Sequence, residues 1–134
     1  MIYIGIDPDI EKCGYAVWDK SDSSLEYRTI SVIELFEDFK LWNVPIHVIL
    51  EAGWLINKSN WHGKSGNVAQ RIAKNVGENH AAGKIIEQFL KYYNISYELV
   101  KPKGKIDAKT FEKITSIKRS NQDVRDAVML VYGL

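Results

Sequence analysis

Four acidic residues have the side chains and the positions to bind a divalent cation. Asp7 and Glu51 each end a short apolar run, whereas Asp123 and Asp126 lie one helical turn apart near the C-terminus. Carboxylate oxygens are the ligands that Mg²⁺ prefers in proteins. If an α/β fold brings the four side chains to one point, the chain has a magnesium site.

The elements that must position these acids follow from the pattern of apolar residues. Turn spacing indicates an antiparallel meander in the first third of the chain. Apolar residues at helix-like spacing then predict a helix, and a proline separates it from a strand that is apolar on both faces. The predicted elements in this half are strands 2–7, 14–19 and 25–32, helix 33–42 and strand 46–50.

The second half is predicted to be mostly helical. Residues 52–66 lack apolar periodicity and predict an exposed loop, after which one long amphipathic helix is expected from Asn67 to Tyr93. Gly77 and Gly83 weaken this helix, and either close packing or a kink would explain them. The remaining predictions are strand 96–100, helix 108–115 capped by Asp107, and a final helix that begins at residue 121 or 122.

Composition excludes several classes of protein. A chain of 134 residues with 46% hydrophobic content predicts a single domain, residues 1–134, with an ordinary core. We see no leader and no apolar run of ~18 residues, so we expect a cytoplasmic protein without a membrane partner. The one cysteine, Cys13, excludes an internal disulfide and a CxxC site, and the three histidines lack zinc-ligand spacing. We expect His47 and His80 to be core histidines.

Charge is distributed unevenly along the chain. Residues 1–51 hold four Lys/Arg and ten Asp/Glu, a net charge of −6, whereas residues 52–134 hold fourteen and seven, a net charge of +7. An acidic metal site beside a basic surface suits a phosphodiester substrate. An accidental scatter of surface lysines is the alternative.

The order of elements matches the ribonuclease H-like fold, an α/β fold with a mixed five-stranded sheet flanked by helices. Three segments also resemble RuvC-type Holliday-junction resolvases in order along nearly the whole chain, which is shorter than typical members, as in a phage or mobile-element version. They are Ile4-Gly5-Ile6-Asp7-Pro8 with Gly14-Tyr15-Ala16-Val17, Leu50-Glu51 with Trp54 three positions on, and the D-x-x-D-A segment Asp123-Val124-Arg125-Asp126-Ala127.

The resemblance implies metal-dependent hydrolysis of DNA. Two Mg²⁺ ions ~3.5–4 Å apart, or Mn²⁺ in their place, can activate a water and neutralise the leaving oxygen. Asp7 would bridge the metals, Glu51 would hold one and Asp126 the other, and Asp123 would act as a ligand or as a proton-transfer group. No nucleotide cofactor is expected.

Basic and aromatic residues are the candidates for contacts with DNA. Trp54 could stack on an opened base or be a core tryptophan, and Arg125 could reach a phosphate or neutralise the carboxylates. The other basic side chains could contact phosphates or be solvated surface. The candidates are Trp54, Lys58, Trp61, Lys64, Arg71, Lys74, Lys101, Lys103, Lys105 and Arg125.

The sequence therefore predicts an endonuclease for branched DNA, most simply four-way junctions. The resemblance further implies a homodimer with helix 67–93 as the contact, because two symmetric cuts need two active sites. A ribonuclease H-like nuclease on other structured DNA or on RNA–DNA hybrids is an alternative, and so is a junction-binding protein without catalysis. A phosphotransferase of the actin and sugar-kinase superfamily would need a second lobe, which this length does not provide.

Overall fold

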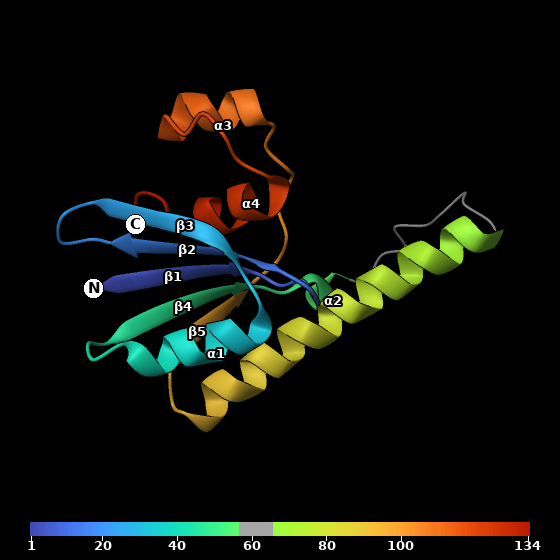
Figure 1. Cartoon of the computed structure of the whole chain (residues 1–134), viewed down its shortest axis with the longest axis horizontal. Helices are drawn as coiled ribbons and strands as arrows, with labels where there is room; N and C mark the ends of the chain where they lie inside the picture. The colour runs from blue at the N-terminus through green and yellow to red at the C-terminus, as the bar shows by residue number, and fades with distance from the viewer. Residues whose placement is uncertain (57–65) are drawn as a thin grey trace.

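Five strands form one mixed sheet in the order β3-β2-β1-β4-β5 (Figure 1). In this computed structural model, which describes residues 1–56 and 66–134, the first three strands are antiparallel, and β1, β4 and β5 are parallel. The sheet that the sequence predicts is confirmed. Its strands are β1 (Ile2–Asp7), β2 (Cys13–Asp19), β3 (Ser24–Ile30), β4 (Ile46–Glu51) and β5 (Ser96–Val100).

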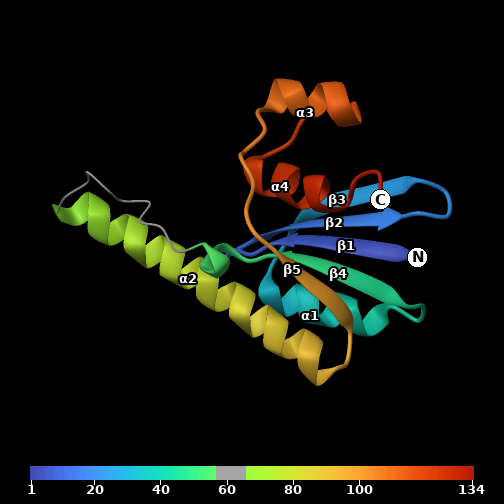
Figure 2. The same ribbon diagram turned by 180° about the vertical axis from the view of Figure 1, so that it is seen from behind.

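Helices cover both faces of this sheet. The helices α1 and α2 lie on one face and α4 on the other, while α3 stands outside α4, away from the strands (Figures 1 and 2). The first half of α2 extends well beyond the sheet. The helices are α1 (Val32–Leu41), the 3₁₀ helix η1 (Gly53–Leu55), α2 (Gly66–Tyr92), α3 (Ala108–Thr115) and α4 (Gln122–Val131). Among the described residues, no helix has the length and hydropathy needed to cross a bilayer.

The predicted strand 25–32 ends two residues after β3 because a capping box begins α1. The Ser31 hydroxyl accepts a hydrogen bond from the Glu34 amide at 3.2 Å and donates to the Glu34 carboxylate at 2.9 Å. The Ser-x-x-Glu pattern is a sequence signal for a helix start. The apolar residues that follow Ser31 therefore belong to the helix.

Two cores stabilise the two layers. On one face, buried residues of alternate strand positions, such as Ile4 and Val48, pack on Leu35 of α1 and Ile86 of α2. On the other face, strand residues that point the opposite way pack on α4, and Phe111 of α3 joins this second core. Period-two alternation of side chains thus places helices on both sides of the strands.

The register of the parallel pair positions the first two acids. Ile6 of β1 lies opposite Leu50 of β4, so the next residues along the chain, Asp7 and Glu51, emerge level with each other. Both lie at the carboxyl ends of adjacent strands, the edge of an α/β sheet where ligands bind.

Candidate active site

Three of the four predicted acids converge at this edge of the sheet. Asp7, Glu51 and Asp126 each offer a carboxylate oxygen, and these oxygens all lie within 4.8 Å of one another. They come from β1, β4 and α4, three elements that are distant in the sequence. The arrangement provides three hard oxygen ligands at one point.

Two glycines allow α4 to approach the sheet closely enough for this geometry. A Cβ atom at Gly14 would overlap the carbonyl oxygen of Asp123, and one at Gly5 would overlap that of Ala127. The helix backbone therefore rests directly on β1 and β2. This contact brings the Asp126 side chain over the end of β1.

The cluster is electrostatically unfavourable without a cation. Burial, followed by the charge of Glu51 and then those of Asp126 and Asp123, raises the pKa of Asp7 to about 9. Burial also raises the pKa of Glu51. Within the described ranges, Glu51 Oε2 is the one buried side-chain oxygen or nitrogen without a hydrogen-bond partner. A buried acceptor of this kind is costly unless a proton or a metal ion satisfies it.

Asp123 lies beside the cluster rather than within it. Its carboxyl group is within hydrogen-bonding reach of Asp7, but its oxygens are not part of the group of three. Burial, and next the charge of Asp9, raises the pKa of Asp123. A carboxyl group in this place can exchange a proton with the cluster, which leaves both predicted roles open.

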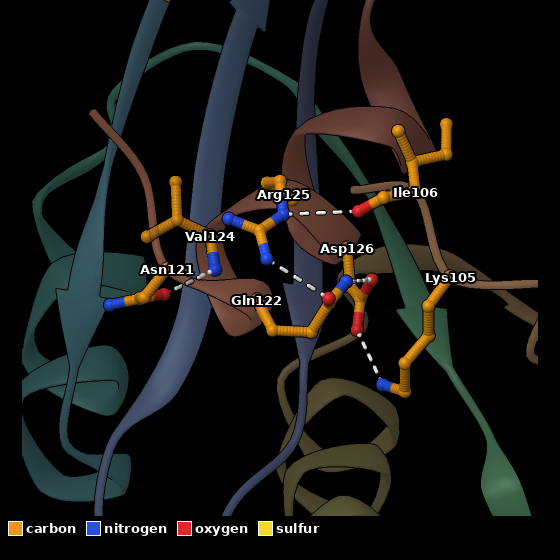
Figure 3. Close-up of polar contacts among 7 residues, drawn as sticks. All are labelled: Lys105, Ile106, Asn121, Gln122, Val124, Arg125 and Asp126. Atoms are coloured by element: carbon orange, nitrogen blue, oxygen red, sulfur yellow. Dashed lines mark hydrogen bonds and ion pairs between the residues drawn. The ribbon is translucent and has the colours of Figure 1, made fainter. Parts of the chain in front are cut away.

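Asp126 is held by two polar neighbours (Figure 3). Gln122 Nε2 donates to Asp126 Oδ1 at 2.7 Å, and Lys105 Nζ lies 3.0 Å from Oδ2. Partial burial lowers the pKa of Lys105, but the hydrogen bond and the charge of Asp126, with those of Asp7 and Glu51, outweigh it and raise this pKa. Gln122 was not a predicted site residue; its position one helical turn before Asp126 is the signal that could have indicated it.

Arg125, a predicted DNA contact, is half-buried and makes hydrogen bonds to the protein itself (Figure 3). Its Nε donates to the carbonyl oxygen of Ile106 at 3.1 Å, its Nη1 to that of Ser120 at 2.8 Å, and its Nη2 to Gln122 Oε1 at 3.0 Å. The guanidinium forms no ion pair with Asp123 or Asp126. Arg125 thus links residue 106, before α3, to residue 120, after α3. Gln122 connects the guanidinium to Asp126.

A cleft of about 780 Å³ opens onto Asp7 and Glu51. The segment 102–105, with Lys103 and Lys105, forms one side, and the middle of α2 forms the other. A second cavity of about 310 Å³ reaches Glu51 and Asp126 from the α4 face and is lined in part by Lys101 and Lys103. The predicted cations of this segment therefore surround the acids.

Trp54 and His80 form part of the cleft wall. The Trp54 indole packs edge-on against His80, with ring centroids 6.2 Å apart, and fills the space over Gly83 of α2, where a Cβ would overlap it. Close packing rather than a kink explains this glycine. His80, expected in the core, is only half-buried, and its Nε2 would lie 2.8 Å from a Cβ at Gly53. Its imidazole faces the same cleft as the acids.

The other predicted DNA contacts lie farther along α2 or outside the described residues. Arg71 and Lys74 are exposed on α2, and Lys74 Nζ lies 3.9 Å from a Glu78 carboxylate oxygen. Nothing in the geometry brings them to the acids. Lys58, Trp61 and Lys64 lie outside the residues that the structure describes.

Comparison with protein-family models and with curated proteins gives no match. Among solved structures, T. thermophilus RuvC in complex with a Holliday junction substrate is similar, with a TM-score of 0.60 and 14% identity over 97% of this chain and 89% of that one. The fowlpox virus Holliday junction resolvase is also similar, with a TM-score of 0.51 and 17% identity over 97% and 94%. The chain has the fold of these resolvases. The predicted resemblance to RuvC is thereby confirmed for the fold, the ribonuclease H-like arrangement of sheet and helices.

Proposed function

We propose that the protein is a metal-dependent endonuclease that cleaves branched DNA, most simply four-way junctions. The observation that carries this proposal is the convergence of Asp7, Glu51 and Asp126, with a buried Glu51 oxygen that has no partner. A cluster that is costly as a bare set of carboxylates becomes favourable when a divalent cation binds it. Two solved structures with the same fold are Holliday junction resolvases.

The residues present fit Mg²⁺ because all three donors are carboxylates and one buried oxygen is unsatisfied. Asp7, Glu51 and Asp126 would hold the metal, and we propose two ions per site. Bound there, Mg²⁺ supplies an activated water and neutralises the leaving 3′ oxygen. Asp123 would accept or return a proton beside Asp7, and a 5′ phosphate would remain on the product.

The cations around the acids would hold the DNA strand. Lys103 and Lys105 line the cleft, and the Lys105 ammonium lies against Asp126. With Asp126 bound to a metal, Lys105 would be free to pair with a phosphate. Trp54 and His80 on the other side of the cleft offer an aromatic edge and a ring nitrogen to the same strand.

We propose a homodimer in which the projecting half of α2 is the contact. The buried residues of α2 all lie from Ala82 onward, whereas Val68 is 43% exposed and Ile72, one turn on, is only half-buried. This leaves an apolar stripe that a second copy would cover. A twofold axis would place two active sites on opposing strands of a four-way junction.

Cleavage of a mobile four-way junction by purified protein, with Mg²⁺ or with EDTA, tests the nuclease. We expect paired nicks with Mg²⁺ and none with EDTA, and a loss of at least ~100-fold in Glu51→Gln, because that change removes a metal ligand. Glu37→Gln, at an exposed position of α1, is the matched control and should cut normally.

A panel of flaps, linear duplex and RNA–DNA hybrid sets the substrate class. If the RNA–DNA hybrid is cleaved faster than the junction, the proposed substrate becomes the hybrid, as for a ribonuclease H-like nuclease. Tight junction binding without cleavage in either Mg²⁺ or Mn²⁺ would overturn the nuclease in favour of a binding protein.

A further inference from the structure

A basic segment leaves the cleft after Lys105, the only one of its cations that contributes to the site described above. This α3 segment, residues 105–120, holds five Lys/Arg and two Asp/Glu, a net charge of +3. Lys105 forms an ion pair with Asp126 of the acidic cluster. The other four cations are exposed, and none of them forms an ion pair within the described part of the chain; they are Lys109, Lys113, Lys118 and Arg119.

The orientation of α3 follows from a single buried side chain. Phe111 is fully buried in the core that α4 forms with the sheet. Since a helix advances ~100° per residue, positions two before and two after Phe111 lie on the opposite face. Lys109 and Lys113 occupy those positions, so α3 presents two cations outward, one turn apart.

Helix stability does not account for both lysines. Lys113 lies in the last turn, where a cation is favourable to the helix dipole. Lys109 is the second residue of α3, close to the positive end of the dipole, where a cation is unfavourable. Asp107 satisfies the start of the helix by accepting from the Thr110 amide at 2.7 Å, which leaves the Lys109 side chain free in solvent.

The α3 segment is also fixed relative to the acids. Arg125 donates to the carbonyl oxygens of Ile106 and Ser120, which are close to the two ends of the segment. Figure 3 shows that the same guanidinium is connected through Gln122 to Asp126. A rigid row of cations beside a cleft that would hold one strand suits the phosphate backbone of the adjoining duplex.

From this geometry we infer that the outer face of α3 is a second DNA site, which binds the backbone of a duplex arm outside the cleft. The inference rests on the proposed function, because it needs DNA as the substrate. The contacts are to phosphates through lysine ammonium groups, so the site adds affinity and orientation without reading bases.

The salt dependence of DNA binding tests this site. Each phosphate contact contributes ~0.9 to the slope of log K against log salt concentration. In a Glu51→Gln background, which keeps the DNA intact, Lys109→Gln with Lys113→Gln should reduce that slope by ~1.8 on both a four-way junction and a linear duplex. The matched control is Lys20→Gln with Lys40→Gln, two exposed lysines at the other end of the sheet, which should leave the slope unchanged.

A slope for the α3 pair equal to that of the control pair would overturn the inference. A loss confined to single-stranded DNA would overturn it as well, because the site would then belong to the cleft. Circular dichroism of both double variants checks that they are folded. The proposed nuclease function is tested separately. If it is wrong, the wild-type protein leaves junctions intact in the Mg²⁺ assay, whatever the slopes of DNA binding.

Discussion

Replacing Asp7 by asparagine should stabilise the metal-free protein at neutral pH. The pKa of this carboxyl group rises from 3.8 to about 9 in the folded chain, chiefly through burial and the charge of Glu51. Between these two values the folded state retains a proton that the unfolded state has released. The free energy of unfolding therefore falls as pH rises from about 4 to about 9, and the cost is absent below the lower value.

The size of the effect follows from the same two pKa values. One pKa unit corresponds to about 1.4 kcal/mol, so the interval from 3.8 to pH 7 gives about 4 kcal/mol as an upper bound. Glu51 shares the proton, and the cluster relaxes when one member is neutral, so we expect Asp7→Asn to raise the free energy of unfolding by about 2 kcal/mol at pH 7.

Urea unfolding in EDTA at several pH values between 5 and 8 measures this effect. The wild-type protein should lose stability as pH rises, whereas the Asp7→Asn curve should be flatter and lie above it. Glu37→Gln controls for the loss of a carboxylate from an exposed position. Parallel curves for wild type and Asp7→Asn, or a less stable amide variant at pH 8, would refute the reasoning.

The remaining predictions concern the metal, the helix packing and the support of Asp126. Added Mg²⁺ at 100 times Kd should raise the free energy of unfolding of the wild-type protein at pH 8 by ~2.7 kcal/mol, which appears as a higher Tm. The Tm of the Asp7→Asn variant should rise much less. Gly83→Ala should cost ~1–3 kcal/mol in urea unfolding because its Cβ would overlap Trp54, whereas Gly77→Ala, with nothing within 4 Å, should be neutral or stabilising by up to ~1 kcal/mol. Gln122→Leu should lower the junction cleavage rate ~10-fold or more while leaving junction affinity in EDTA unchanged, because it releases one oxygen of Asp126 without removing a cation; equal losses in rate and affinity would contradict that role.

The sequence predicted the elements and the acids because both depend on local signals. Apolar periodicity located the five strands and the four α-helices within a few residues, but it missed the 3₁₀ helix η1, which lies in the predicted loop 52–66. The carboxylates stood at the strand ends, where parallel pairing brings residues level. The end of β3 was the main error in the bounds, and its cause, the Ser31 and Glu34 capping box, is visible in the sequence.

Packing and backbone partners could not be predicted in the same way. The Trp54 indole fills the space over Gly83, some thirty positions along the chain, and no local pattern specifies that contact. Arg125 bonds to the carbonyl oxygens of residues 106 and 120, and every residue has such an oxygen, so its partners leave no signature. A cation between two acids suggested a phosphate contact or neutralisation of the carboxylates, whereas in the fold its hydrogen bonds link residue 106 to residue 120.

The arginine that ties residue 106 to residue 120 has an evolutionary consequence. Because the segment between them is closed at its base and anchored by Phe111, its exposed positions can change without moving the carboxylates. Changes at those exposed positions would alter the outer surface of α3 while preserving the cluster of acids. The same segment offers protein engineers a place to graft a foreign recognition element onto an intact scaffold.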